Sequence, residues 1–293
     1  MIDEGVLREQ IFERLRIRLL ESGGFLTREE LSSFDTGDGT PRRLIDTSKG
    51  IWNPRDLVAT LSIVSSPDGP YDDQELSGGM VRYDYRAGST AGDNAKLRRA
   101  GELGIPLIWL RKYRAGAYIP VFPVYVVEDD IERRQFLIAI DDSARALSSR
   151  TQPSELERRY VERVTRQRLH QAMFRGMVID AYEVRCAVCR LRHGDLLDAA
   201  HIIADREETG LAIVVNGVSL CKIHHAAYDR NLLGISGDYV VHINQRLLDE
   251  TDGPMLKHGL QEMHGQPLTL PRRPASHPDP ERLSTRFAAF AAL

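Results

Sequence analysis

The chain has 293 residues, which is long enough for two domains that each bury a core. Hydrophobic residues make up 42% and charged residues 28%, so the composition excludes disordered and collagen-like classes. The formal net charge of −3 excludes a uniformly basic surface, and any affinity for a polyanion must come from local patches. No apolar run is long enough to span a bilayer, and the first residues lack a secretory signal pattern, so we expect no membrane partner.

The first 150 residues predict helices followed by a sheet. Apolar residues, Val6 among them, recur at helical spacing over residues 4–22, and Thr27 caps a second, shorter helix. Another helix is predicted over residues 94–103. Runs typical of strands, separated by polar connections rich in glycine and proline, occupy residues 57–64, 80–86, 105–113 and 118–127. Together they predict a curved mixed sheet with flanking helices.

Aromatic and acidic side chains gather at the loops and strand ends of this predicted sheet. A base that leaves its stack needs flat faces to stack on and a polar group for its Watson–Crick edge. A carboxylate can accept a hydrogen bond from the exocyclic amino group of cytosine, so aspartate beside tyrosine suits such a pocket. The alternative is that the aromatic rings alternate into the β core. The candidate pocket residues are Trp52, Tyr71, Asp72, Asp73, Tyr83, Asp84 and Tyr85.

A long helix is predicted between the two halves of the chain. Ser154 and Glu157 form a capping-box pattern, and the helix is expected to reach Ala181 with Tyr160 and Val161 facing inward. Its other face carries a row of arginines suited to phosphate groups, with intrahelical ion pairs to neighbouring glutamates as the alternative. The row consists of Arg158, Arg159, Arg163 and Arg166.

All three cysteines lie in one segment with metal-ligand spacing. Cys186 and Cys189 form one pair, and Cys221 and His224 form a second pair that also has two residues between its members. Two such pairs suit a tetrahedral structural zinc site. A redox dithiol, the alternative for a lone CxxC pair, needs no second pair that ends in histidine. Because metal accounts for every cysteine, we expect a reducing cytoplasm rather than a disulfide framework.

Strand and helix patterns lie between and beside these ligands. Residues 198–202 end an apolar run that predicts a strand, residues 211–215 predict a second strand, and Asn216-Gly217 predicts a turn. Residues 222–230 have helical spacing, which places His225 and Asp229 on one face. A neutral histidine such as His201 titrates near working pH and can take a proton from water.

This segment, through DAAHI, NGVSLC and HHAAYD, resembles the HNH (ββα-metal) endonuclease family. The resemblance implies that His201, Asn216 and His225 are the catalytic residues, with His201 as the general base. It also implies that His225 is a ligand of a catalytic Mg²⁺ or Mn²⁺, while Asn216 holds the loop or orients His201. Asp198 is the expected carboxylate partner of the cation. Ala200 stands where many relatives carry an acidic residue, and Asp229 is the alternative.

Residues 45–130 resemble, more loosely, the SRA-like (YDG-type) readers of modified cytosine found in modification-dependent restriction enzymes. The resemblance is carried by GIWNP at residues 50–54, by YDY at residues 83–85 and by NAKLRRAGELGIPLIWL at residues 94–110. Tyr85 stands where the signature usually has glycine, which leaves open a reader of another DNA mark.

The sequence therefore predicts an α+β protein with an SRA-like reader domain over residues 1–150, a linker helix over residues 151–180, and a zinc-stabilised HNH domain with a C-terminal extension over residues 181–293. The implied function is that of a type IV-like restriction endonuclease, acting on double-stranded DNA that carries 5-methylcytosine or 5-hydroxymethylcytosine. Because one HNH site cuts one strand, a homodimer is expected. The alternatives are a catalytically inactive DNA-binding protein, and an HNH nuclease whose first domain reads another mark, such as phosphorothioate, or binds a protein.

Overall fold

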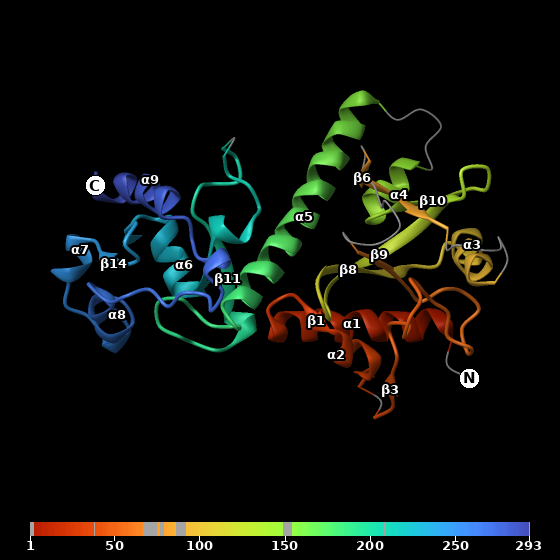
Figure 1. Cartoon of the computed structure of the whole chain (residues 1–293), viewed down its shortest axis with the longest axis horizontal. Coiled ribbons are helices and arrows are strands. Elements are labelled where there is room, and N and C mark those ends of the chain that lie inside the picture. The colour runs from red at the N-terminus through yellow and green to blue at the C-terminus, as the bar shows by residue number, and fades with distance from the viewer. Residues whose placement is uncertain are drawn as a thin grey trace. The chain divides into compact units, whose positions relative to one another are not determined.

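The structure is a computed structural model that describes residues 3–37, 39–66, 75–76, 79–85, 92–148, 154–207 and 209–292. The chain divides into two compact units (Figure 1). Unit 1 comprises Met1–Leu19 and Phe25–His170, and unit 2 comprises Leu20–Gly24 and Gln171–Leu293. The predicted linker helix is α5 (Glu155–Ala181), which begins in unit 1 and ends in unit 2. Within the described ranges, no helix is both long enough and apolar enough to cross a membrane.

Unit 1 is built on a curled, half-barrel sheet, which among the described residues has eight strands. The strand order along the sheet is β4 (Ile51–Trp52), β5 (Ser62–Ser65), β8 (Leu107–Arg114), β9 (Ala117–Asp130), β10 (Gln135–Ala139), β7 (Met80–Asp84) and β6 (Glu75–Leu76), with β1 (Leu26–Thr27) beside β9. Strands β5 and β8 pair in parallel and the other pairs are antiparallel, so the predicted mixed sheet is confirmed.

Helices and a small hairpin complete unit 1. They are α1 (Glu4–Ser22), α2 (Arg28–Ser32), the pair β2 (Phe34–Asp35) and β3 (Pro41–Arg42), α3 (Asp93–Leu103) and α4 (Asp142–Ser148). The predicted cap at Thr27 is confirmed, because its hydroxyl accepts the backbone N–H of Glu30 in a complete capping box. Helix α1 buries Leu7, Ile11 and Leu15. Val6 was predicted to lie on the apolar face of this helix, but it lies about 100° around the helix from Leu7 and is 49% exposed.

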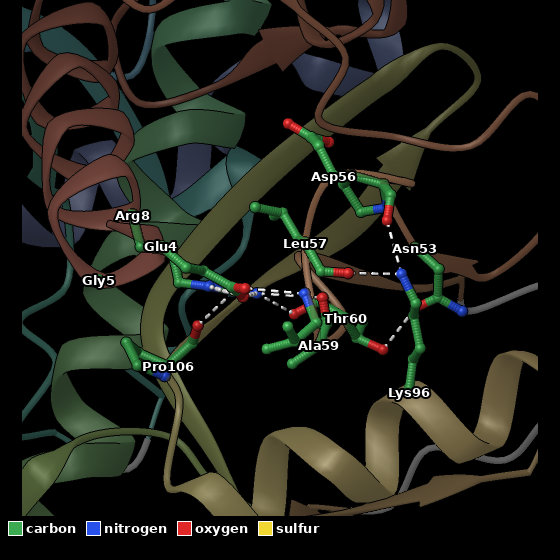
Figure 2. Close-up of polar contacts among 12 residues, drawn as sticks. Glu4, Gly5, Arg8, Asn53, Asp56, Leu57, Ala59, Thr60, Lys96 and Pro106 are labelled. Carbon is green, nitrogen blue, oxygen red and sulfur yellow. Dashed lines mark hydrogen bonds and ion pairs between the residues drawn. The ribbon is translucent and has the colours of Figure 1, made fainter. Parts of the chain in front are cut away.

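A buried arginine explains why the predicted strand over residues 57–64 begins only at Ser62. Arg8 on α1 is 1% exposed, pairs with Glu4 at 2.8 Å, and donates to the carbonyl oxygens of Thr60 and Pro106 at 2.9 and 2.8 Å (Figure 2). The Lys96 ammonium donates to the Leu57 carbonyl oxygen at 2.6 Å. Side chains thus satisfy carbonyl groups that a neighbouring strand would otherwise need to pair, and this stretch stays irregular.

Unit 2 contains a ββα arrangement followed by smaller elements. Strand β11 (Leu197–His201) pairs antiparallel with β12 (Gly217–Cys221), and α6 (Lys222–Asp229) follows at once. The remaining elements of unit 2 include a second hairpin, formed by β13 (Leu233–Ile235) and β14 (Val241–Ile243), and a last helix, α9 (Pro280–Ala291). The others are η1 (Gly194–Leu196), η2 (Val214–Asn216), α7 (Gln245–Leu248), α8 (Pro254–Gly259), η3 (Gln261–Met263) and η4 (Pro274–Ser276).

The prediction of a strand over residues 211–215 with a turn at Asn216-Gly217 is wrong. Residues 214–216 form the 3₁₀ turn η2, and the strand that pairs with β11 starts at Gly217. The cause is Asn216, whose side chain is fully buried and donates to the carbonyl oxygens of Ile203 and Leu211, both at 3.0 Å. These bonds fold the preceding residues back as a loop, so they cannot extend along a neighbouring strand.

Candidate active site and metal centre

Three thiols and one imidazole gather at the start of α6. The ligand atoms of Cys186, Cys189, Cys221 and His224 all lie within 4.8 Å of one another. The Cys189 and Cys221 sulfur atoms are 3.9 Å apart, and His224 Nδ1 is 3.1 Å from the Cys221 sulfur. A tetrahedral zinc with bonds of about 2.3 Å to sulfur separates its thiolates by about 3.8 Å, so the donor set fits such an ion.

The other ring nitrogen of His224 is held by the backbone. His224 Nε2 lies 2.7 Å from the carbonyl oxygen of Gly259, which leaves Nδ1 facing the three sulfur atoms. Metal-binding histidines commonly donate their second nitrogen to a carbonyl or carboxylate in this way, because the bond fixes the ring and its tautomer. Cys221 is both the last residue of β12 and the N-cap of α6. A metal held by the cluster would therefore fix the angle between the hairpin and this helix.

His201 ends β11 with its ring stacked on Phe174 of α5. The ring centroids are 3.8 Å apart and the planes differ by 16°. His201 Nε2 is buried and has no hydrogen-bond partner among the described residues. Burial is the main reason why the pKa of His201 is lowered, and the charge of His225 lowers it further, while Asp205 opposes the shift. His201 is thus held as a neutral imidazole, the form in which it can accept a proton.

His225 follows the metal-cluster histidine and lies between two carboxylates. Its Nδ1 is 3.5 Å from Asp198 Oδ2, and its Nε2 is 3.4 Å from Asp229 Oδ2. The hydrogen bond to Asp198 is the main cause of a raised pKa for His225; burial opposes the rise and the charge of Asp229 adds to it. Two carboxylates that stabilise a positive imidazole create the negative potential that a divalent cation also needs.

A cavity of about 890 Å³ joins these residues within unit 2. His201, His225, Asp198 and Asp229 line it together, so the structure brings the predicted base and all three candidate cation ligands to one place. Residues 186–236 match the family model described as HNH endonuclease. This part of the chain is an HNH endonuclease domain.

Two solved structures are similar to this chain at low identity. One is a modification-dependent TagI restriction endonuclease, with 17% identity, 91% of each chain covered and a TM-score of 0.31. The other is the type IV phosphorothioation-dependent restriction endonuclease ScoMcrA, with 15% identity, 62% of this chain and 48% of that chain covered, and a TM-score of 0.24. Both TM-scores are low, so neither similarity defines the fold of this chain. Among curated proteins no relative matches it.

Asn216, predicted from the sequence as a catalytic residue, anchors the loop that follows His201. Its carbonyl oxygen accepts the N–H of Ile202, and its side-chain oxygen accepts the N–H of Ile203, both at 2.9 Å. With the two bonds donated by its amide group, the Asn216 side chain ties both ends of the loop between β11 and β12. Of the two roles predicted for Asn216, the geometry corresponds to holding the loop.

Three residues that contact the site were not singled out in the sequence. Phe174 and Arg175 lie on α5, before the matched region, and Lys222 lies on α6. The Lys222 ammonium is 2.6 Å from Asp198 Oδ2, and Arg175 Nε is 3.8 Å from Asp198 Oδ1. Burial alone would raise the pKa of Asp198, but hydrogen bonds from His225 and Lys222 outweigh burial and leave it lowered. Of these three residues, only Lys222 could have been found from the sequence, because it directly follows Cys221 of the cluster.

The predicted base-pocket residues that the structure describes are packed into unit 1. Tyr83 and Tyr85 are 5% and 3% exposed; the Tyr83 hydroxyl donates to the Gly50 carbonyl oxygen, and the Tyr85 ring stacks on Phe136 at 4.5 Å. The Trp52 indole donates to the Arg43 carbonyl oxygen, and Asp84 accepts from Gln135. The alternative interpretation, core aromatics, agrees with the burial of the two tyrosines. Tyr71, Asp72 and Asp73 lie outside the described residues.

The predicted arginine row on α5 is described in part. Arg159 forms an ion pair with Glu155 one helical turn away, as the alternative interpretation expected, and Arg163 is exposed. The side chains of Arg158 and Arg166 lie outside the described part of the chain. Tyr160 was predicted to face inward but is 61% exposed.

The stacking of Phe174 on His201 predicts a positioning role that can be separated from packing. In Phe174→Leu, the imidazole loses the flat surface that holds it, and we expect kcat for DNA cleavage to fall roughly tenfold to a hundredfold with little change in KM. Val178→Ala is the control, because Val178 is equally buried and also packs near Gly217, but it is not stacked on His201. Cleavage kinetics and thermal melting of both variants test this. Equal losses of kcat in both variants would contradict the positioning role.

Proposed function

We propose that the chain is a modification-dependent restriction endonuclease, in which unit 2 cleaves DNA and unit 1 recognises a modified base. The nuclease activity belongs to the HNH domain at residues 186–236. The observation that carries the proposed site is the shared cavity, where the neutral His201 ring and the carboxylate-flanked His225 ring face the same space. A base and a cation site around one phosphate are the requirements of metal-assisted phosphodiester hydrolysis.

His201 is the proposed general base. Its Nε2 is sealed from solvent, so Nδ1 is the nitrogen assigned to accept the proton of the attacking water. The lowered pKa keeps this nitrogen unprotonated at neutral pH, and the Phe174 stack keeps the ring in one orientation. Asn216 contributes by fixing the loop that starts directly after His201.

His225 and Asp229 are the proposed protein ligands of a catalytic Mg²⁺ or Mn²⁺, with Asp198 orienting the imidazole. The sequence favoured Asp198 as the ligand, but its carboxylate lies 2.6 Å from the Lys222 ammonium, which opposes a second cation there. The side chain of Asp229 is 61% exposed and faces the opposite nitrogen of His225. A divalent cation at this place supplies positive charge to the phosphate and to the departing 3′ oxygen.

Zn²⁺ is the proposed ion of the Cys186, Cys189, Cys221 and His224 cluster. Three thiolates and an imidazole are soft and borderline ligands that favour zinc over magnesium or manganese. Its role is structural, because four protein ligands leave no open coordination position for substrate. The protein therefore uses two kinds of metal site, with His224 assigned to one and His225 to the other.

Unit 1 is the proposed reader of modified cytosine. An HNH site makes most of its contacts to the DNA backbone, so selectivity for a substrate must come from another part of the chain. The resemblance of residues 45–130 to SRA-like readers supports this division of labour. Trp52, Tyr71, Asp72, Asp73 and Asp84 remain predicted pocket residues. The burial of Tyr83 and Tyr85 favours a role for these two rings in supporting the sheet. A homodimer would supply the second site that a double-strand break requires.

Matched plasmids test the proposed substrate. With Mg²⁺ or Mn²⁺, we expect the purified chain to cut a plasmid that carries 5-methylcytosine and to leave the unmodified copy intact. His201→Ala should lose cleavage by at least about a hundredfold, since general-base catalysis contributes that much or more. Equal cutting of both plasmids would contradict the modified-base reader. Preferential cutting of a phosphorothioate-containing copy would replace cytosine modification with that mark, and binding without any cutting would favour the inactive DNA-binding alternative.

Two carboxamide variants test which carboxylate completes the cation site. We expect Asp229→Asn to raise the half-saturating Mn²⁺ concentration for cleavage at least tenfold more than Asp198→Asn does, because only the former removes a direct ligand. Titration of the cleavage rate with Mn²⁺ for both variants gives the comparison. A larger effect of Asp198→Asn than of Asp229→Asn would contradict this assignment and favour Asp198 as the cation ligand, as the sequence predicted.

A further inference from the structure

We propose that Arg175, Arg206 and Arg286 bind the DNA phosphates that flank the scissile one. All three line the cavity that also contains His201 and His225. They come from three separate parts of the chain, namely α5, the loop between β11 and β12, and α9. Two of them lie outside the matched HNH region, so the nuclease surface extends beyond its motif. This inference rests on the proposed function, since it assumes that the cavity holds a DNA backbone.

Arg175 is oriented by the protein before any ligand arrives. Its Nη2 donates to the carbonyl oxygens of Gly194 and Leu197, at 2.8 and 3.0 Å, and its Nε faces Asp198. Burial lowers the pKa of Arg175, yet a guanidinium starts from so high a value that it stays charged. A planar, prepositioned guanidinium loses little conformational entropy when it binds a phosphate.

Arg286 is oriented in the same manner from α9. Its Nη2 donates to the carbonyl oxygen of Tyr228 at 2.8 Å, and its guanidinium carbon lies 5.0 Å from the centre of the Tyr228 ring. Tyr228 belongs to α6, the helix that carries His225. Arg286, on α9, is thus held against the helix that carries the proposed cation ligand His225, although the two residues lie far apart in the sequence.

Helix α9 is packed firmly enough to serve as a wall of the site. A Cβ on Gly234 of β13 would come within 2.5 Å of the Phe290 ring, so the glycine permits a close approach of α9 to this strand. The N–H of Asp279, the N-cap of α9, donates to the Val215 carbonyl oxygen at 2.9 Å. Arg282 donates to the carbonyl oxygen of Thr209, in the loop that also carries Arg206. These contacts connect α9 to β13 and to the connection between β11 and β12 that carries Arg206.

Arg206 supplies an exposed charge beside the two oriented ones. It makes no ion pair with any described residue, and the neighbouring Asp205 and Glu207 line the same cavity. These carboxylates prevent a broad positive field, so the arginines are expected to act as local donors to individual phosphates. Such a pattern is compatible with a chain whose formal net charge is −3.

Salt dependence of DNA binding tests the inference without relying on cleavage. Binding of a fluorescent duplex to the full chain is measured without added Mg²⁺ or Mn²⁺ over a range of NaCl concentrations, for wild type and for Arg175→Gln, Arg206→Gln and Arg286→Gln. Each lost phosphate contact should reduce the slope of log K against log salt by about 0.9 and weaken binding several-fold. Arg282→Gln is the control, because Arg282 bonds the loop but does not line the cavity. Thermal melting checks the fold of each variant.

Slopes equal to that of wild type in all three variants would overturn the proposal, as would a wild-type chain that does not bind DNA. A variant that melts early is replaced by its lysine counterpart, which should keep the slope but lose the bidentate geometry and bind more weakly. If the variants show reduced slopes but the wild-type chain cuts no plasmid, the proposed arginine contacts are supported and the proposed catalytic function is contradicted. Normal cleavage with unchanged slopes would sustain the catalytic function and overturn the arginine contacts.

Discussion

The geometry of the nuclease site depends on one corner of the chain, where β12 ends and α6 begins at Cys221. This residue is at once the end of the hairpin, the N-cap of the helix and a member of the Cys3His cluster. His225 lies one turn into α6, and His201 lies at the end of the strand paired with β12. The junction at Cys221 therefore determines the distance and orientation between the two imidazole rings. A metal in the cluster would therefore determine catalytic geometry without contacting substrate.

The site is completed by residues that the HNH motif does not contain. Helix α5 supplies the Phe174 ring against His201 and the Arg175 guanidinium near Asp198, while α9 reaches the cavity from the C-terminal end. Gly217 shows how closely these parts fit, because a Cβ there would come within 2.4 Å of Val178 and 2.9 Å of Phe174. The Asn216-Gly217 pair thus serves the packing of α5 against the hairpin and the shape of the loop together.

The sequence predicted which residues of the C-terminal half gather in space, but not the contacts that other segments make with them. Ligand spacing predicted the Cys3His cluster, and the motif placed His201 and His225 in one cavity, because both depend on residues close in the chain. Residues 211–215 have the composition of a strand, but the buried Asn216 amide binds their backbone, a tertiary effect that overrides propensity. The periodicity of apolar residues could not show that Arg8 would donate hydrogen bonds to carbonyl oxygens near Thr60, nor that Phe174 would stack on His201.

The most direct test is the zinc content of the full chain and of Cys189→Ser, measured by mass spectrometry together with cleavage and tryptophan fluorescence. Both tryptophans, Trp52 and Trp109, lie in unit 1, so their emission reports on that unit separately. We predict one zinc per chain in wild type, and in Cys189→Ser a loss of zinc and of cleavage with unchanged tryptophan emission. A wild-type chain that contains no zinc and still cuts DNA would contradict the proposed role of the cluster.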